Sequence, residues 1–380
     1  MTDVSGTREV HDRIEVEVAV VGGGVVGAAA AWALARRGRA VALFEAHEAG
    51  HSLGASHGTT RNFNPAYSSP HHLRLLRRAL PLWRELEAES GEVLLEQTGL
   101  VERGPRADAA ALAAEAPMFG FDVERIPAAE AERRWPGLRF AGSATFLPQG
   151  GRLFADRAVR ALHDGAVAHG AAVHHTSPVR SILPRGDDLV ELRTDAHAIR
   201  ARRVVVAAGA WTDPLLRGLV RLPRLTVTEE HPAHFALRLG DDGAGWPSFN
   251  HAPEPSGFRW PGPVYGLVSP GEGVKVGWHR VGPVVTPQTR TFTPSTELSE
   301  SLRRYVREWM PGADPDVFEP ISCTYTSTDD GDFVLDRTGP IVVAAGFSGH
   351  GFKFAPAIGE HLASLASGTA PTIAGFRLER

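Results

Sequence analysis

The glycine-rich stretch GGGVVG at residues 22–27 constrains the fold more than any other feature of this sequence. It follows the run Glu15 to Val21, in which valines alternate, and it precedes Ala28 to Arg37, which has the composition of a helix. Ala40 to Phe44 then predicts a second strand. A strand, a glycine turn, a helix and a second strand within about 30 residues form the βαβ unit that binds a dinucleotide.

Three glycines and one carboxylate have separate tasks in such a unit. Among Gly22, Gly24 and Gly27, one permits the tight turn, one lets the pyrophosphate approach the backbone, and one lets the helix pack close to the strand. The helix N-terminus would offer free N–H groups to the phosphates. Glu45 ends the second strand, where a carboxylate can accept both ribose hydroxyls, and it disfavours the 2′-phosphate of NADP. The alternative is a glycine-rich turn in another kind of α/β protein.

Composition and charge exclude several classes of protein. The 380 residues, 43% hydrophobic, are enough for a large core and two domains. A formal net charge of −4 without a block of like charge argues against nucleic-acid binding, and the absence of a long apolar run argues against a membrane partner. Met1 to Arg13 is polar, which predicts a short disordered lead-in rather than a secretory signal. The single cysteine, Cys323, argues against disulfides and a zinc site, so we expect no metal and a cytoplasmic location.

Pieces of dinucleotide-binding type recur in the middle and near the end of the chain, as RVVVAAGAW (203–211) and IVVAA (341–345). Residues 222–292 carry short alternating runs that indicate an antiparallel sheet. We therefore predict an α/β fold, α+β overall, in which a Rossmann-type FAD-binding domain is interleaved with an antiparallel-sheet substrate domain. The FAD-binding domain would comprise 14–95, 152–222 and 318–376, and the substrate or catalytic domain 96–151 and 223–317. A nucleotide fold spread over the whole chain favours FAD, which is long enough to touch both ends, over NAD.

Smaller elements follow from periodicity and helix signals. The patterns predict helices over 73–89, with Pro81 marking a kink, over 298–309, and from Pro356 to Ser367. They also predict a strand over Thr98 to Glu102.

Four segments carry a resemblance to a known family, which extends from about Val18 to Phe376. They are VVGGGVVGAAAAWALARRG (20–38), GASHGTTR (54–61), GVKVGWH (273–279), and SCTYTSTDDGDFVLD (322–336) with AAGFSGHGFKF (344–354). The sequence resembles the sarcosine oxidase and N-methyltryptophan oxidase group of the D-amino-acid-oxidase-like FAD-dependent oxidoreductases. The resemblance implies oxidation of the C–N bond of a secondary amine or N-substituted amino acid to an imine, with O2 reduced to H2O2.

The resemblance also implies roles for residues near the C-terminus. Cys323 matches the cysteine that bonds to the 8α-methyl group of the flavin, and a thiolate is a plausible nucleophile there; a buried structural cysteine is the alternative. The loop from Ala344 to Phe354 would lie against the isoalloxazine ring. Lys353 would pair with the substrate carboxylate, unless it is a solvated surface lysine. The glycines and the histidine that would approach the ring are Gly346, Gly349, Gly351 and His350.

Lys275 matches the family lysine that lies over the flavin and activates oxygen, where a positive charge favours the anion formed first. His279 is an even number of strand positions further on and would share its face. The alternative is a solvent-facing Lys/His stripe on an edge strand. Tyr265 matches an active-site tyrosine that contacts substrate, and Arg61 would lie near the ring as a catalytic cation. Further expected cofactor contacts are Ser56, His57, Thr60, the backbone at Val179, Ala208, Gly209 and Trp211.

One position departs from the family pattern. The arginine usually found three residues after the residue that matches Arg61 is here Asn64. Arginine makes a bidentate ionic contact with a carboxylate, whereas asparagine makes only neutral hydrogen bonds. Sarcosine would therefore lose anchoring, and a larger secondary amine or N-substituted amino acid fits better, with Asn64 still expected to contact substrate.

Two competing functions stay open. A dehydrogenase would pass the electrons to a carrier other than O2, and a non-catalytic flavin-binding protein would lack turnover. The expected partners are a small-molecule amine or amino acid and O2, acting on a monomer.

Overall fold

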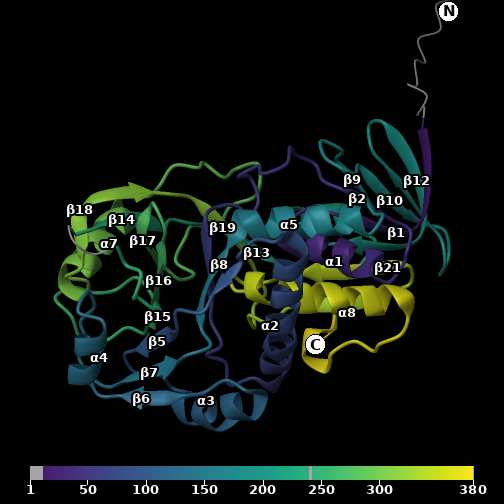
Figure 1. Ribbon diagram of the computed structural model, residues 1–380. Coiled ribbons are helices and arrows are strands. Elements are labelled where there is room, and N and C mark those ends of the chain that lie inside the picture. The colour runs from purple at the N-terminus through teal and green to yellow at the C-terminus, as the bar shows by residue number, and fades with distance from the viewer. Residues whose placement is uncertain (1–11, 239–241, 380) are drawn as a thin grey trace, which may run out of the picture.

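The computed structural model describes residues 12–238 and 242–379, which form two large sheets with helices packed around them (Figure 1). Residues 1–11, which make up most of the predicted lead-in, lie outside the described residues. No helix in the described ranges is both long and apolar enough to cross a membrane.

The first large sheet has the parallel centre that a dinucleotide fold requires. Its strand order is β10-β11-β12-β1-β2-β9, with β21 beside β12 and β20 beside β21. Strands β9, β2, β1, β12 and β21 run parallel to their neighbours in this series. The bounds are β1 (Asp12–Val21), β2 (Val41–Phe44), β9 (Ala172–His174), β10 (Ser181–Pro184), β11 (Val190–Arg193), β12 (His197–Val206), β20 (Val334–Thr338) and β21 (Ile341–Ala345).

Strand β1 begins three residues before the predicted start at Glu15. The reason is the length of its partner β12, which begins at His197 rather than at the predicted Arg203 and pairs with β1 from Asp12 onward. The polar residues at these strand ends conceal the pairing in the sequence.

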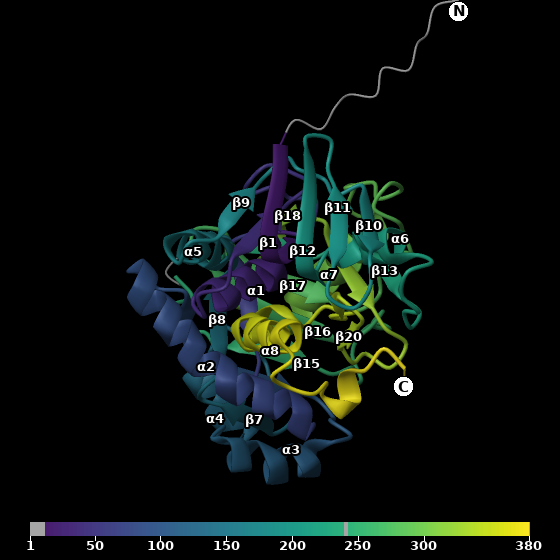
Figure 2. The same cartoon turned by 90° about the vertical axis from the view of Figure 1, so that its right-hand side faces the viewer.

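Helices α1 (Val25–Ala35), α5 (Ala155–Ala168) and α8 (Ala355–Ser367) pack together beside the first sheet, and α2 (Pro70–Ser90) lies across α5 and α8 (Figures 1 and 2). The alanine-rich surface of α1 lets α8 approach closely, since a Cβ on Gly359 would lie 2.4 Å from the Ala29 backbone. The N-terminal and C-terminal parts of the chain are therefore neighbours in one layer. Pro81 lies inside α2 without ending it.

The second large sheet has the order β18-β14-β17-β16-β15-β5-β7-β6. It is antiparallel as predicted, except that β15 and β5 run parallel because they come from distant parts of the chain. Strand β5 also starts at Leu100 rather than at Thr98. The bounds are β5 (Leu100–Arg103), β6 (Glu124–Ile126), β7 (Ala144–Leu147), β14 (Ala233–Leu237), β15 (Ser248–His251), β16 (Val264–Ser269), β17 (Gly273–Trp278) and β18 (Ala313–Pro320).

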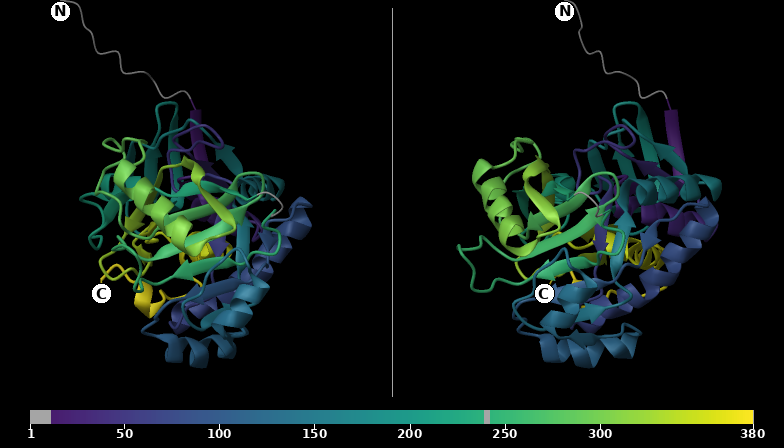
Figure 3. Two further views of the ribbon diagram at one scale, coloured as in Figure 1. Left: turned by 90° about the vertical axis from the view of Figure 1, so that its left-hand side faces the viewer. Right: turned by 60° about the vertical axis from the view of Figure 1, so that its left-hand side comes forward.

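Helix α7 (Thr296–Trp309) packs on this sheet against β17 and β18 (Figure 3). It begins two residues before the predicted helix because Ser295 caps it by accepting a hydrogen bond from the Leu298 amide. The shorter helices are α3 (Ala109–Glu115), α4 (Ala128–Arg134) and α6 (Thr212–Leu216), and the 3₁₀ turns are η1 (Ala116–Phe119), η2 (Gly209–Trp211), η3 (Phe352–Phe354) and η4 (Ala374–Phe376).

Two small sheets lie between the large ones. One consists of β3 (Thr60–Phe63), β8 (Gly151–Phe154) and β4 (Leu95–Glu96), and the other of β13 (Thr226–Glu230) with β19 (Cys323–Ser327). Strand β13 therefore does not belong to the large sheet predicted for residues 222–292, because its antiparallel partner is β19, about 100 residues later in the chain. These small sheets bring the segments that carry Arg61 and Cys323 into the centre of the molecule.

Candidate active site

The first part of the site is the edge where the parallel strands β1, β2 and β12 end. The Gly22 amide donates to the carbonyl of Phe44 at 2.9 Å, and the Ala207 amide donates to the carbonyl of Val21 at 2.9 Å. Gly22 has a φ of 101°, and a Cβ on Gly27 would lie 1.9 Å from the Gly22 carbonyl oxygen. Neither position admits a larger residue without a backbone shift. The geometry is that of a dinucleotide-binding turn at the carboxyl ends of parallel strands.

Glu45 is buried at this edge and already has hydrogen-bond donors. Its carboxylate accepts from the amides of Gly23 at 2.6 Å and His47 at 3.0 Å, and lies 3.3 Å from Nε2 of His51. Burial raises the pKa of Glu45, but the hydrogen bonds from His51, Gly23 and His47 outweigh it and lower this pKa to about 2. The carboxylate is therefore ionised at neutral pH.

Ser56 corrects the expectation of free amides at the start of α1. Its Oγ accepts a hydrogen bond from the Val25 amide at 3.0 Å, which caps the helix from a distant loop. Together with the bond from Gly23 to Glu45, this occupies two amides of the turn. The residue that caps the helix is 31 positions away from it in the sequence, so local motif analysis could not find it.

Other expected cofactor contacts gather at the same edge. The Ser177 amide donates to the Glu45 carbonyl at 2.8 Å, two residues before Val179. Gly209 and Trp211 form the η2 turn directly after β12 and Ala208, and the ring of Trp211 lies 5.7 Å from that of His47. The structure thus brings the segments 45–47, 177–179 and 208–211 together.

The second part of the site is a cavity of about 500 Å³ between the large sheets. Its walls come from segments that are far apart in the sequence. They are β3 and the residues after it, β16 with β17, the start of β19 and the loop before α8, together with Arg106, Asp108, Asn250 and residues 330–332. The residues singled out from the sequence that line it are Thr60, Arg61, Asn64, Tyr265, Lys275, His279, Cys323, Gly349, His350 and Lys353.

Lys275 lies on β17 in the middle of the second sheet, between β14 and β16, and its side chain is only 6% exposed. The alternative of a solvent-facing stripe on an edge strand is therefore wrong. Burial, followed by the nearby charge of Arg61, lowers the pKa of Lys275 to about 7. Arg61 is fixed by donating to the carbonyls of Ala55 at 2.9 Å and His57 at 2.5 Å.

His57 and Thr60 support the same wall. Nδ1 of His57 lies 2.8 Å from the Gly54 carbonyl, and burial, followed by the charge of Arg61, lowers the pKa of His57 to about 4. The hydroxyl of Thr60 is fully buried and lies 2.5 Å from that of Ser269 on β16. His57 is therefore neutral, and the contact of Thr60 with Ser269 holds β3 against the second sheet.

A pair of phenols and a histidine continue the wall beyond Lys275. Tyr265 and Tyr325 are joined by a hydrogen bond between their side chains, and burial raises the pKa of both. Gly277 makes room for Tyr265, because a Cβ there would lie 2.7 Å from its ring. The ring of His279 lies 5.5 Å from that of Tyr325, and burial lowers the pKa of His279 to about 4, which leaves it neutral.

Lys353 lies on another wall of the cavity and is 4% exposed, so the alternative of a solvated surface lysine is wrong. Its ammonium donates to the His350 carbonyl at 2.7 Å and lies 5.3 Å from the centre of the Tyr67 ring. Burial lowers the pKa of Lys353 to about 7. Nδ1 of His350 in turn lies 3.0 Å from the Tyr67 hydroxyl, which fixes the imidazole.

The three glycines of the C-terminal loop make room for protein atoms. A Cβ on Gly349 would lie 2.4 Å from the ring of Tyr325, and one on Gly346 would lie 2.5 Å from Thr328. A Cβ on Gly351 would lie 2.7 Å from the side chain of Phe347. Close packing within the protein, rather than approach to a flat ring alone, therefore explains why these positions are glycine.

Asn64 lines the cavity, and its side-chain oxygen accepts a hydrogen bond from the Ala66 amide at 2.7 Å. Sequence analysis missed Arg106, which lines the same cavity from the loop after β5. Its guanidinium lies 2.8 Å from Glu102 and 2.6 Å from Asp108. A lone arginine in a loop carries no local signal of such a role.

Sequence analysis also missed Tyr67 and His72, which line the cavity near Lys353. Their rings are stacked at 5.0 Å, and burial lowers the pKa of His72 to about 4. Tyr67 follows the segment GTTR by only a few residues, so it could have been singled out. His72 lies in α2 at a position where helical periodicity predicts only burial.

The glycine turn at the edge where β1, β2 and β12 end, which we call the glycine edge, fits a flavin dinucleotide together with the cavity. Three observations of the described residues support this fit. The glycine turn lies at the carboxyl ends of the parallel strands β1, β2 and β12, which is where folds of this type bind a dinucleotide. The buried cations Lys275 and Lys353 line one cavity with Arg61, and positive charge stabilises a reduced anionic ring. The side-chain oxygen of Asn62 is buried at the cavity wall without a hydrogen-bond partner.

Comparison with known proteins supports the same assignment. The family model described as "FAD dependent oxidoreductase" matches residues 17–365. Monomeric sarcosine oxidase from Bacillus sp. (strain NS-129) is 33% identical over 365 residues, covering 92% of each chain. N-methyl-L-tryptophan oxidase from Citrobacter koseri is 29% identical, covering 97% of this chain and 99% of that protein.

The solved structures agree with this result. A variant of NikD, described as an unusual amino acid oxidase essential for nikkomycin biosynthesis, superposes with a TM-score of 0.83 at 28% identity, over 96% of this chain and 97% of that one. With the glycine edge, the cavity and the full-length match in view, the chain belongs to the family of FAD dependent oxidoreductases.

Proposed function

We propose that this protein oxidises the C–N bond of a secondary amine or N-substituted amino acid and passes the electrons to O2. The observation that carries the proposal is that two buried lysines, Lys275 on strand β17 and Lys353 in the η3 turn, line the same cavity. Its sarcosine oxidase and N-methyltryptophan oxidase relatives act, by their names, on N-methylated amino acids. Bound FAD would supply the electron chemistry by accepting a hydride equivalent from the carbon beside the nitrogen.

The two lysines would have separate roles, one in substrate binding and one in the reaction with O2. Lys353 holds the carboxylate of an amino-acid substrate, because its ammonium is buried and makes no ion pair among the described residues. Lys275, backed by Arg61, provides the positive charge that stabilises the anion formed when O2 accepts the first electron. Tyr265 and His279 would orient the amine, and neutral His279 leaves the amine free to react in its unprotonated form.

The glycine edge would hold the dinucleotide half of the cofactor. Gly22, Gly24 and Gly27 shape the turn. Glu45 would accept hydrogen bonds from the ribose hydroxyls in place of the one that it now accepts from the Gly23 amide. Cys323 would form a thioether with the flavin, since it is partly buried and lines the cavity. Among the residues that the structure describes, the one hydrogen-bond contact of its sulfur is a long one of 3.9 Å to the Thr324 carbonyl.

The substrate would be larger than sarcosine. Asn64 cannot provide a second ionic anchor for a carboxylate, and Arg106 already contacts Glu102 and Asp108. We also propose that the enzyme acts as a cytoplasmic monomer with the two interleaved domains described above.

A panel of secondary amines and N-substituted amino acids, assayed for H2O2, tests the proposal. We expect flavin bleaching without air and H2O2 formation in air with at least one N-substituted amino acid. Reduced flavin that survives for minutes in air would establish a dehydrogenase instead. A flavin that no member of the panel bleaches would support a non-catalytic flavin-binding protein.

The covalent link has its own test. After acid precipitation of the wild-type protein, we expect the yellow colour in the pellet, and in the Cys323→Ser protein we expect it in the supernatant. Colour in the supernatant for both proteins would show that the flavin is bound without a thioether.

A further inference from the structure

A buried ion pair beside the single cysteine is not used by the proposed function. Arg290, in the loop between β17 and α7, has a side chain that is 2% exposed, and its Nε lies 3.7 Å from the carboxylate of Glu229, which is 1% exposed. Taking two charges out of water costs more free energy than their attraction returns unless further hydrogen bonds satisfy them. The pair therefore needs either a dense set of partners or a functional reason.

The partners of Arg290 connect segments that are distant in the sequence. Its guanidinium donates to both the carbonyl and the hydroxyl oxygen of Ser322 at 3.0 Å, and to the carbonyl of Leu53 at 2.9 Å. Ser322 directly precedes Cys323, and Leu53 belongs to the loop that also carries Ser56. One side chain thus holds the backbone beside the thiol against the loop that caps α1.

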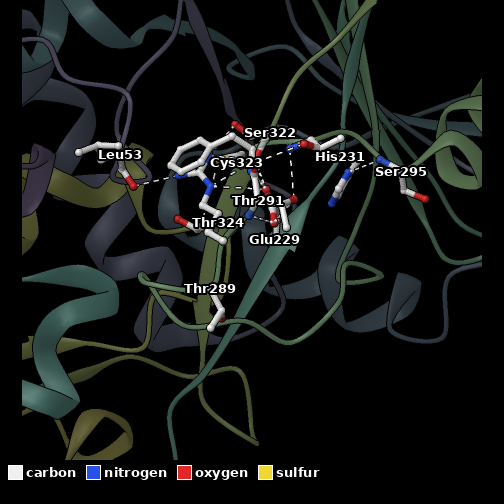
Figure 4. A network of polar contacts seen from close by, with 12 residues as sticks. Leu53, Glu229, His231, Thr289, Thr291, Ser295, Ser322, Cys323 and Thr324 are labelled. Atoms are coloured by element: carbon white, nitrogen blue, oxygen red, sulfur yellow. Dashed lines mark hydrogen bonds and ion pairs between the residues drawn. The ribbon is translucent and has the colours of Figure 1, made fainter.

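Glu229 completes the network around the cysteine (Figure 4). Its carboxylate accepts hydrogen bonds from the amides of Thr291 at 3.0 Å and Phe292 at 2.8 Å, and from the hydroxyl of Ser322 at 2.8 Å. Burial raises the pKa of Glu229, but these hydrogen bonds outweigh it and keep the pKa below its ordinary value. Ser322 is therefore held from both sides, by the cation and by the anion.

The local charge explains why a cation is needed there. Glu229 and Glu230 are both buried on β13, and Glu230 pairs directly with Cys323 across the two-stranded sheet. The sulfur that would bond to the flavin thus lies near two buried carboxylates. Arg290 lies close enough to interact electrostatically with both Cys323 and Glu229, and a guanidinium stays charged when buried.

From this arrangement we infer that Arg290 is a positioning residue for the attachment of the flavin to Cys323. It fixes the backbone at Ser322 so that the sulfur faces the cavity, and it offsets the charge of the neighbouring carboxylates. The inference rests on the proposed thioether link.

Formation of the thioether is a two-electron oxidation, and O2 is the oxidant. The thiol of Cys323 loses its proton, and its sulfur forms a bond to the 8α-methyl carbon of FAD, which loses one hydrogen. The two electrons left on the flavin pass to O2, which takes up two protons and becomes H2O2. Arg290 takes no part in these bond changes, and its contribution lies in the position of the sulfur and in the counter-charge to Glu229.

The test compares Arg290→Met and Arg290→Lys with the wild type. Flavin-free protein, prepared under riboflavin limitation, is mixed with FAD in air, and acid-stable flavin in the protein pellet is measured over time. We expect attachment to Arg290→Met to be about tenfold slower or worse, because a sulfur that is no longer held in position meets the methyl group less often. Arg290→Lys keeps the charge but loses the forked contact with Ser322, so its rate should lie between the two.

Matched variants separate positioning from general damage. Arg185→Met removes an exposed arginine that pairs with Glu191 at 3.0 Å and does not line the cavity, and it should attach flavin at the wild-type rate. Ser322→Ala removes one acceptor of Arg290 and one donor to Glu229, and should slow attachment even if Arg290→Met does not fold.

The outcomes distinguish this inference from the proposed thioether. Wild-type protein that releases all of its flavin in acid would overturn both. Wild-type protein that retains it, with the Arg290 and Ser322 variants attaching flavin equally fast, would overturn the role of Arg290 alone.

Discussion

The glycine edge and the central cavity differ in whether the protein itself supplies partners for their polar groups. At the edge, the carboxylate of Glu45 and the amides of Gly23 and Val25 are already satisfied by hydrogen bonds within the protein. In the cavity, Arg61, Lys275 and Lys353 form no ion pair with any residue in the ranges that the structure describes. The edge is thus preformed by polar groups that bind one another, whereas the cavity keeps cations available for anionic ligands.

At the glycine edge, cofactor binding therefore depends mainly on the shape of the backbone turn. In the cavity, the reaction depends mainly on the charge of the side chains. A change of shape at the edge should therefore abolish cofactor binding, while a change of charge in the cavity should leave the cofactor bound and alter the reaction. The following predictions test this contrast.

The largest effect is expected from Gly27→Ala. The new Cβ would lie 1.9 Å from the Gly22 carbonyl oxygen, so the helix must move away from the strand. Overpacking of this kind costs about 1–3 kcal/mol or more, and we expect purified protein without flavin. Absorbance at the flavin band and thermal unfolding measure the effect. Gly142→Ala is the control, because its Cβ meets open space; flavin-replete Gly27→Ala protein would contradict the role of shape.

Lys275→Met should retain flavin but react slowly with O2. Loss of one preorganised charge at a developing anion slows a reaction by about 10²–10³-fold. Stopped-flow mixing of the reduced enzyme with aerated buffer measures this rate, while anaerobic reduction by substrate should change much less. A variant that reoxidises at the wild-type rate would show that another cation, such as Arg61, is sufficient.

Carboxylate binding should weaken as pH rises through about 7. Burial lowers the pKa of Lys353 from its ordinary 10.5 to about 7, so the ammonium is charged below that pH and neutral above it. The inhibition constant of propionate, which carries no amine, should rise by up to about tenfold per pH unit above 7. Lys353→Met should bind propionate weakly at every pH, and a wild-type constant that stays flat from pH 6 to 9 would argue against Lys353 as the anchor.

The smallest change is expected from Asn64→Arg. A hydrogen bond to a charged group contributes about 1 kcal/mol more than a neutral one, so KM for sarcosine should fall by roughly fivefold to tenfold. The test is steady-state kinetics with sarcosine and with the best substrate of the panel, with Asn64→Gln as the matched neutral control. An unchanged KM for sarcosine would show that position 64 does not reach the carboxylate.

Local patterns were enough for the glycine edge. GGGVVG and the strands on either side lie within one short βαβ unit, so the tight turn at Gly22 and the close helix at Gly27 could be predicted from neighbouring residues. The cap from Ser56 could not, because it joins residues 31 positions apart. The family resemblance, in turn, singled out Lys275 and Lys353 but gave no information on whether they are buried.

The sequence by itself determined the nucleotide fold, the family and the lysines, Arg61 and Cys323 that line the cavity, because each is recorded in a continuous segment of the chain. Only the tertiary structure decided that Lys275 lies in a central strand, that β13 pairs with β19, and that Arg290 holds Ser322 beside Cys323. Burial and charge pairing depend on residues brought together from distant parts of the chain, and no local pattern records which of them will meet.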